Sequence, residues 1–389
     1  MKKILCLLHK HQFGDAQFPI SVEYNAIYKT LKTINKKTYF FDTHKKNDIF
    51  LNNISLLKFV KKIKPDIIFC HQSSYEIYSE TFEIIKSFCS PTIINWCSDD
   101  SWRYKQHSVL IAKSFDLMVT TYKEAHINNL NKKINSILSN WGCPNNWFIE
   151  PKKKISYLYD VCFIGNAYMG RKKIIKNLQD LGFSIQCFGK GWKDAVANKD
   201  LPRTIHHSKI NLNFSKSRGN KPQTKARVFE ITGSGGFCLT EYSKEVKSLF
   251  KENHEIVIFK NLNELIYKIK YYLHNEYERK LICKNGYLKC YNKYSYKNIM
   301  INILKKISKI KYKKNIIHPT YKAYNLIRTN PHWLLRSYKS VSQSIFKLFF
   351  SKHDAVKLSR RLLFEIEWRL RGEKTYSLNG WCNNLFNYH

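Results

Sequence analysis

Residues 225–241 read KARVFEITGSGGFCLTE, and this stretch governs how the second half of the chain is interpreted. Its first part predicts a helix that turns its apolar residues toward a core. The GSGG run predicts the end of that helix, because glycine tolerates the left-handed backbone at a helix C-terminus. The apolar residues that follow predict a short strand. A helix, a tight turn and a buried strand together indicate part of an α/β sheet.

Two charged side chains, Arg227 and Glu230, lie in the helical part of this stretch. A carboxylate at Glu230 can accept hydrogen bonds from two hydroxyls of a ribose, and Lys225 and Arg227 can hold a diphosphate. The alternative is an amphipathic helix with exposed charges and a glycine cap. The residues themselves leave both interpretations open.

Upstream of this stretch, DVCFIG at 160–165 predicts another strand, and the residues after it predict a loop that opens a helix. A helix N-terminus after a strand suits an anion, because its first backbone N–H groups have no partner within the helix. Gly165, Asn166 and Arg171 are therefore candidate phosphate contacts. The spacing of Gly165 and Gly170 does not match GxGxxG, so no dinucleotide fingerprint is predicted.

The first half of the chain alternates short apolar runs with segments of helical periodicity, which predicts a parallel sheet covered by helices. Ligands of such sheets bind at the carboxyl ends of the strands. The polar residues that follow the predicted strands are His71, Asp99 and Asp100, which are candidate catalytic residues, and Gly14 with Asp15, a candidate phosphate loop. The alternatives are helix capping by either aspartate and a structural role for the histidine.

The composition allows two folded domains, because the chain has 389 residues and is 43% hydrophobic. The apolar run near the N-terminus is too short for a signal peptide and predicts a first strand. Eleven cysteines without a CxxC pair predict reduced thiols in a cytoplasmic protein, and no zinc site. A segment rich in Pro, Asn and Lys at 145–157 predicts a linker. We therefore expect domains at 1–150 and 151–310, and a tail at 311–389.

The net charge of +38 predicts attraction to polyanions such as nucleic acid, anionic lipid or phosphorylated substrates. The tail at 311–389 has no clear strand pattern and predicts basic helices. Leu358, Leu362, Ile366 and Leu370 form a stripe flanked by arginines. Such a stripe is typical of a helix on an anionic membrane surface. The alternative is an ordinary helix packed on the second domain.

The pattern R-x-F-E-x-x-x-x-G-G-x-x-L-T-E at 227–241 resembles the signature of the CgeB-like glycosyltransferases, relatives of family 4 with the GT-B architecture. The segments DVCFIGNAYMGRKKII and INLNFS resemble pieces of the same family in the same order, as does the region 262–296. KPDIIFCHQ, INWCSDDSW, FDLMVTT and LSNWGCPNNWF resemble its N-terminal pieces. The resemblance covers about residues 1–305, and the tail matches no pattern of this family.

The resemblance implies an α/β fold of two Rossmann-like domains facing across a cleft, with the nucleotide-sugar donor mainly on the C-terminal domain and the acceptor mainly on the N-terminal one. Glu230 would bind the ribose, and Gly235 and Gly236 would let the backbone approach the nucleotide. The implied activity is a hexosyltransferase-type transfer to a saccharide, lipid-linked or surface-glycan acceptor, as in polysaccharide biosynthesis. It requires neither a cofactor nor a metal.

Arg227, with Lys225 or Arg171, would neutralise the diphosphate as it leaves. Because the departing diphosphate gains charge, preorganised cations stabilise the transition state more than the ground state. Asp99 or Asp100 would orient or deprotonate the acceptor hydroxyl.

The chain departs from the wider family 4 pattern at one position. Those relatives carry a second glutamate eight positions before the ribose-binding one, where this chain has Pro222 after Lys221. Contacts to the donor sugar would then come from Asn220 or Gln223. A retaining mechanism is accordingly an inference by analogy alone.

Three other functions are compatible with the sequence. A basic chain with 25 Tyr and 24 Phe can bind nucleic acid through phosphate contacts and base stacking, although no recognition motif is present. An epimerase acting on a nucleotide sugar, or a relative without activity, would share the same fold. The expected location is the cytoplasm, with the hypothesis that the basic tail holds the protein at the inner face of the membrane.

Overall fold

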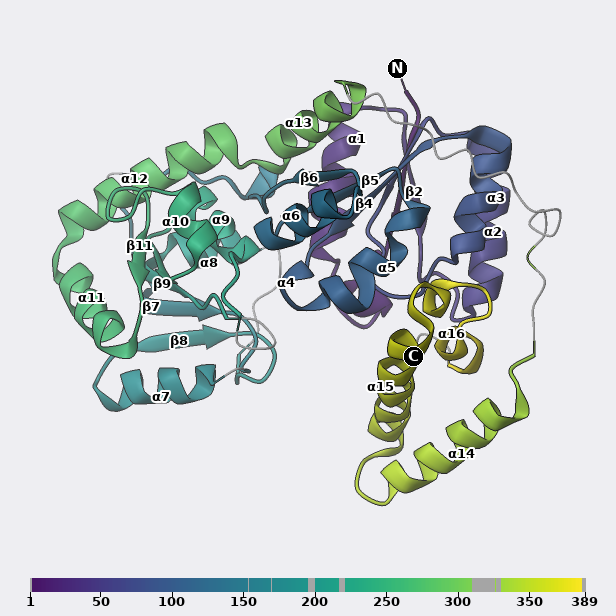
Figure 1. The fold of residues 1–389 in the computed structure, drawn as a ribbon. Coiled ribbons are helices and arrows are strands. Elements are labelled where there is room, and N and C mark those ends of the chain that lie inside the picture. The colour runs from purple at the N-terminus through teal and green to yellow at the C-terminus, as the bar shows by residue number, and fades with distance from the viewer. Residues whose placement is uncertain are drawn as a thin grey trace. The chain divides into compact units, whose positions relative to one another are not determined.

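The computed structural model describes residues 2–152, 154–168, 170–194, 200–216, 221–309, 326 and 330–386 (Figure 1). The chain forms two compact units, one of Met1–Leu138 with Lys309–His389 and the other of Ser139–Ser308. Each unit has its own parallel sheet with connecting helices. The predicted α/β class with two Rossmann-like sheets is therefore confirmed.

The first unit has, within the described residues, a sheet of six parallel strands in the order β2-β1-β3-β4-β5-β6. Strands β1, β3 and β5 are buried at every residue, as expected for strands covered by helices on both faces. Ile4 pairs with Thr38 on one side of β1 and with Ile67 on the other. The strands are β1 (Ile4–Leu8), β2 (Thr38–Asp42), β3 (Ile67–Cys70), β4 (Thr92–Cys97), β5 (Leu117–Thr120) and β6 (Ser136–Leu138).

The helices of the first unit connect these strands and supply the other half of its core. Helix α2 begins where the Asp48 side chain accepts a hydrogen bond from the Leu51 backbone N–H at 2.9 Å, and it turns Leu56 and Val60 into the core. The helices are η1 (Gln12–Gly14), η2 (Tyr24–Lys29), α1 (Thr30–Ile34), α2 (Ile49–Ile63), α3 (Ser79–Cys89), α4 (Asp100–Arg103), η3 (Tyr104–Ser108), α5 (Val109–Ile111), η4 (Ala112–Ser114) and α6 (Lys123–Asn131).

The second unit has, over its described residues, five parallel strands in the order β11-β10-β9-β7-β8. The strands are β7 (Tyr159–Ile164), β8 (Ile185–Phe188), β9 (Ser208–Asn213), β10 (Cys238–Glu241) and β11 (Val257–Phe259). The helices are η5 (Asn145–Trp147), α7 (Arg171–Asp180), α8 (Leu201–His206), α9 (Ala226–Gly233), α10 (Lys244–Leu249), α11 (Leu262–His274), α12 (Glu276–Lys293) and α13 (Tyr296–Lys309).

Both sheets reverse their strand order at the same relative place. In each unit the first strand lies between the second and the third, so the switch points fall between β1 and β3 and between β7 and β9. Open α/β sheets bind ligands outside the carboxyl ends of the strands at such points. The topology thus directs the search for a site to the loops after these four strands.

The junction between the units lies about a dozen residues before the expected one at 150. The expected linker packs on the second unit: the Ile149 N–H donates to Gly233 O at 3.2 Å, and just before the linker the Cys143 N–H donates to Tyr294 O at 2.8 Å. These bonds satisfy backbone groups of a segment that the sequence shows only as rich in Pro and Asn. The contacts of the segment, rather than its composition, determine the unit to which it belongs.

The C-terminal region is mainly helical within residues 330–386, as expected, while residues 311–325, 327–329 and 387–389 of the expected tail lie outside the described part. It forms α14 (Trp333–Lys347), α15 (Lys352–Arg371), η7 (Gly372–Tyr376) and α16 (Trp381–Leu385). Leu363 and Phe364 belong to the core of the first unit, and the Tyr376 hydroxyl donates to Gln106 O at 2.5 Å. The expected alternative of packing on the second domain is wrong, because the buried face of α15 completes the first unit.

Candidate functional site

Arg171 joins the two strand ends at the switch point of the second unit. Its guanidinium donates to Asn166 O at 3.1 Å, after β7, and to Phe214 O at 3.4 Å, after β9. It is 7% exposed, and burial lowers its pKa. The side chain predicted to contact phosphate therefore fixes the loop that would receive the phosphate. A direct contact with phosphate stays a prediction.

Helix α9 presents Lys225, Arg227 and Glu230 along its first two turns, as the sequence predicted. Lys225 is the N-cap residue, and the Arg227 guanidinium lies 2.7 Å from the Glu230 carboxylate. The Glu230 side chain is buried, and this burial raises its pKa although the arginine opposes the shift. Burying a carboxylate costs desolvation free energy that a paired cation offsets only in part. Carboxylates with pKa values perturbed in this way cluster at functional sites.

Gly235 and Gly236 lie just before the amino end of β10, whereas the switch point lies at the carboxyl ends of β7 and β9. Gly235 has φ +68°, and a Cβ atom there would collide with Ile149 O. A Cβ atom at Gly236 would come 2.6 Å from a methyl carbon of Ile205. The structure thus gives both glycines a packing role within the unit, and their approach to a nucleotide stays a prediction.

Gly165 follows β7 and lies close to the end of β8. Its N–H donates to Phe188 O at 2.8 Å, and its carbonyl accepts from the Trp192 indole N–H at 2.8 Å.

Gln223 is 2% exposed, and its backbone N–H donates to Ser215 O at 3.0 Å. Asn220 lies outside the described residues. The donor-sugar contacts expected from this loop remain predictions.

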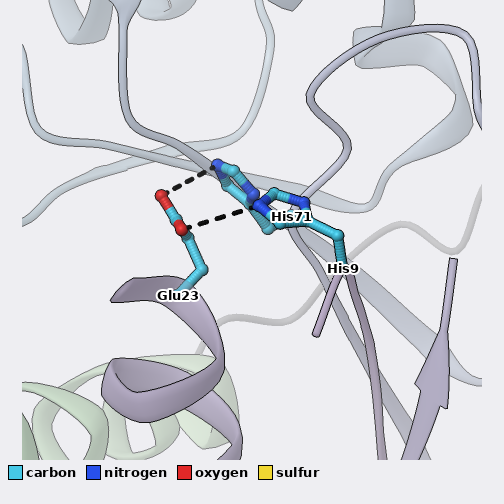
Figure 2. A group of neighbouring side chains, drawn as sticks. All are labelled: His9, Glu23 and His71. Atoms are coloured by element: carbon cyan, nitrogen blue, oxygen red, sulfur yellow. Dashed lines mark ion pairs between the residues drawn. The ribbon is translucent and has the colours of Figure 1, made fainter. Parts of the chain in front are cut away.

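At the switch point of the first unit, His71 meets two residues that the sequence interpretation did not include. His9 directly follows β1, His71 directly follows β3, and Glu23 immediately precedes η2 (Figure 2). The Nε2 atom of His9 lies 3.7 Å from one carboxylate oxygen of Glu23, and that of His71 lies 3.8 Å from the other. Three separate elements therefore bring two imidazoles and a carboxylate together.

The charges of this cluster follow from its burial. Burial lowers the pKa of His71 to about 4, so this imidazole is neutral at pH 7. Burial alone would raise the pKa of Glu23, but the two histidines outweigh it and lower the value to about 2. Burial alone would lower the pKa of His9, but the negative charge of the Glu23 carboxylate outweighs this effect and raises the pKa of His9. The cluster thus holds an ionised carboxylate facing two imidazoles.

The two aspartates after β4 lie in different surroundings. The Asp100 side chain is buried and accepts hydrogen bonds from the Ser108 and Thr120 hydroxyls, each at 2.5 Å. Asp99 is the N-cap residue of α4, and its backbone carbonyl accepts from Arg103 N at 3.0 Å. Asp100 thus holds η3 to the end of β5, and a catalytic role for either residue stays a prediction.

Gly14, the predicted phosphate-loop residue of the first unit, packs against a histidine. Its φ is +78°, and a Cβ atom there would overlap the His44 ring. The nearby His11 and Ile20 form an antiparallel bridge that closes the loop after β1. The positive φ and the close contact with His44 account for a glycine at this position, and its role as a phosphate loop stays a prediction.

Sequence reasoning found His71 but missed His9 and Glu23. His9 could have been found by the same rule, because it too directly follows an apolar strand. Glu23 lies on a helix that begins well after its strand, and no spacing pattern links it to either histidine. The π-helix η2, which begins directly after Glu23, belongs to a rare type that occurs preferentially at functional sites.

Residues 171–305 match a family model described as glycosyl transferase-like. This segment contains α7, α9 and the strands β8 to β11 of the second unit. It is about a third of the chain, so the match characterises the second unit rather than the whole protein. A comparison with curated protein sequences finds no match.

Solved structures of similar fold include HepE of Anabaena in complex with UDP and glucose, at 10% identity and a TM-score of 0.57, covering 80% of this chain and 100% of that one. A glycosyltransferase from Rickettsia africae has 13% identity and a TM-score of 0.54, covering 79% and 99%. A Listeria monocytogenes protein provisionally assigned as a UDP-N-acetylglucosamine 2-epimerase has 10% identity and a TM-score of 0.50, covering 79% and 96%. The likeness shows that the chain has the GT-B fold.

Proposed function

We propose that this protein is a glycosyltransferase that transfers a hexose-type sugar from a nucleoside-diphosphate sugar donor. The observation that carries the proposal is the Arg227–Glu230 pair on α9, within the segment that matches a glycosyl transferase-like family. A buried carboxylate beside a cation suits a donor that offers ribose hydroxyls and a diphosphate. The CgeB-like subgroup, which rests on the motif at 227–241, forms part of this proposal, as does a retaining outcome, which rests on analogy with family 4.

The donor-side residues would have two separate roles, binding of the ribose and neutralisation of the diphosphate charge. Glu230 would accept the ribose hydroxyls, while Lys225 and Arg227 would stabilise the diphosphate as it gains charge on leaving. Arg171 would act through position, because it ties the loop after β7 to the end of β9. We propose that this neutralisation is done by side chains, without a metal at the diphosphate.

The test is a thermal-shift panel of UDP, GDP, ADP, CMP and their common sugar conjugates on the wild type, Glu230→Gln and Glu264→Gln. A ligand that binds only the folded state stabilises it by about 2.7 kcal/mol at 100 times its Kd. We expect one base to stabilise the wild type and Glu264→Gln, whose substitution lies on α11, but not Glu230→Gln. Equal stabilisation of all three proteins would contradict the assigned donor site.

A nucleotide-sugar epimerase is the second candidate, because a protein provisionally assigned to that activity shares the fold. The two activities differ in their products. A transferase releases the nucleoside diphosphate, whereas an epimerase returns a nucleotide sugar with an altered sugar. Nucleic-acid binding, suggested by the charge of +38, would instead appear as salt-sensitive binding to generic DNA without a nucleotide shift.

We further propose that the acceptor is a saccharide on a lipid carrier or a surface glycan, and that α14 holds the protein at an anionic membrane. Val341 and Ile345 are exposed on one face of α14, which leads into the turn Leu348–Phe349–Phe350. Leu348 and Phe349 are 78% and 75% exposed. No helix in the described part of the chain is long and apolar enough to cross a membrane.

Two exposed lysines, Lys347 and Lys352, flank this apolar turn in the sequence, and α14 and α15 carry two more exposed cations farther from it, Arg336 and Lys357. Each lysine or arginine near an anionic surface contributes about 1 kcal/mol of attraction, and apolar side chains at the tip add the energy of burial. The stripe predicted on α15 is exposed at Leu362, Ile366 and Leu370, whereas Leu358 is half-buried.

Flotation with phosphatidylglycerol-containing vesicles tests this surface. The combined variant Leu348→Ser, Phe349→Ser and Phe350→Ser should lose binding, because it removes apolar area without changing charge. The control is Leu158→Ser with Tyr277→Ser, two exposed apolar residues of the second unit. Equal flotation of both variants would refute the proposal. Deleting the whole tail is unsuitable, because its α15 completes the core of the first unit.

A further inference from the structure

We propose that His9, Glu23 and His71 bind a divalent transition-metal ion, of which Zn²⁺ is the best match, at the switch point of the first unit. Among the described residues these three form a group whose ligand atoms all lie within 4.8 Å of one another. Figure 2 shows the carboxylate of Glu23 directed toward both rings. The site lies on the first unit and is independent of the proposed donor residues.

The distances within the cluster fit an ion better than direct bonds. Separations of 3.7 and 3.8 Å between imidazole nitrogen and carboxylate oxygen are too long for hydrogen bonds. Ligands at about 2.0–2.2 Å from a tetrahedral zinc lie about 3.4 Å apart. Each histidine–carboxylate pair would therefore have to close by only a few tenths of an ångström, while the widest pair of ligand atoms, within 4.8 Å, would have to close by up to about 1.4 Å.

The ligands come from firmly held parts of the fold. Strands β1 and β3 are neighbours, and the His71 N–H donates to Leu7 O at 3.0 Å, which fixes the two histidines side by side. Both are buried, at 7% and 5% exposure for His9 and His71. Ser21 anchors the approach to Glu23, since its hydroxyl donates to His9 O at 2.8 Å. Preorganised ligands lose little entropy when an ion binds.

The surroundings of the cluster favour positive charge, against the basic character of the chain as a whole. The carboxylates of Glu76 and Asp42 act on His9 in addition to that of Glu23. Glu76 is fully buried and accepts hydrogen bonds from the backbone N–H groups of Ser73 and Ser74. Arg103 is the opposing cation, and its guanidinium donates to Ser73 O. The carboxylates outnumber this arginine.

The ligand set indicates both the type of metal and its use. Two imidazoles and one carboxylate suit Zn²⁺ and other first-row divalent ions, and three protein ligands leave at least one position open to water or a hydroxyl. The Ser98 hydroxyl lies 3.2 Å from His71 Nε2, and an ion would displace this contact. This proposal departs from the sequence-based expectation of a protein without metal, which stays a prediction.

Calorimetric titration of the full-length, chelator-treated protein with ZnCl₂ tests the proposal. We expect one ion per chain at this site, and a loss of affinity in His9→Ala, His71→Ala and Glu23→Gln at least as large as the roughly 10- to 100-fold that loss of an outer-shell partner causes. Glu23→Gln preserves the size of the side chain and therefore tests the site even if an alanine variant fails to fold. The matched controls are His274→Ala and His353→Ala, two exposed histidines, which should bind like the wild type.

Co²⁺ as a spectroscopic probe separates this site from the cysteines. The visible bands of a Co²⁺ complex at this site should lack thiolate charge transfer and should weaken in Glu23→Gln. Zinc binding of equal affinity in the wild type and Glu23→Gln would overturn the proposal. Thiolate bands, or the absence of any binding by the wild type, would overturn it as well. The nucleotide panel is read separately, so failure here does not bear on the donor site.

Discussion

Replacing Glu367 by alanine should loosen the C-terminal part of the first unit, because this glutamate holds α15 to the start of α16. Its side chain is fully buried on α15. One carboxylate oxygen accepts from Trp381 N at 2.6 Å, the other accepts from Cys382 N at 2.9 Å, and Arg371 pairs with the group at 3.2 Å. The substitution removes both acceptors and leaves two backbone donors without their partners.

The cost can be worked out from these contacts. An unsatisfied buried donor costs about 1–3 kcal/mol, so two of them cost about 2–6 kcal/mol, in the range of about 3–5 kcal/mol for breaking a buried ion pair. Glu365 provides the matched control, two positions earlier on the same helix. Its partners Arg361 and Arg369 are exposed, so Glu365→Ala should cost about 0–1 kcal/mol.

Hydrogen–deuterium exchange resolves the two units separately, which a single melting curve would not. In Glu367→Ala, peptides from the C-terminal helices and from β3 should exchange about 100-fold faster, the equivalent of about 3 kcal/mol. Peptides from β9 and β10 should be unchanged, as should all peptides in Glu365→Ala. Equal exchange in the two variants, or unchanged protection in β3, would refute the integration of the tail into the first unit.

Two further predictions follow from single buried side chains. His107 is 3% exposed, and burial lowers its pKa well below 6.5, so the unfolded chain binds the extra proton. Stability should therefore fall as the pH drops through 6.5, approaching about 1.4 kcal/mol per pH unit well below it; between pH 6.5 and 5.5 the wild type should lose about 1 kcal/mol that His107→Gln does not lose in denaturation experiments. Arg171→Lys loses the fork that bridges Asn166 O and Phe214 O, so urea denaturation should show a loss of about 1–3 kcal/mol. Unchanged slope in the first case, or unchanged stability in the second, would contradict these assignments.

The sheets could be predicted from the sequence, because a strand buried on both faces is a continuous apolar run bounded by polar residues. His71 was found because it directly follows such a run. Glu23 was not, because its approach to the histidines depends on the path of a loop that no periodicity records. Arg171 was identified as a cation near phosphate, but only the structure shows its carbonyl partners.

The tail shows a second limit of sequence reasoning. The periodicity of α15 predicts an amphipathic helix but does not say which unit covers it. The predicted stripe through Leu362 and Ile366 is exposed, whereas Leu363 and Phe364 are buried beside it. Neighbouring apolar residues on one helix cannot be told apart by their sequence pattern. The shape of the surface on which the helix packs determines which of them become buried.

The central claim, that the protein transfers a sugar from a nucleoside diphosphate, is tested most directly by ³¹P NMR of candidate nucleotide sugars incubated with the protein. Without an acceptor, a transferase releases nucleoside diphosphate slowly, because water takes the sugar in place of the acceptor. With a suitable acceptor the release is faster. We expect this release for one nucleotide base with the wild type and its loss in Glu230→Gln. Conversion to another intact nucleotide sugar, or release that is the same in both proteins, would contradict it.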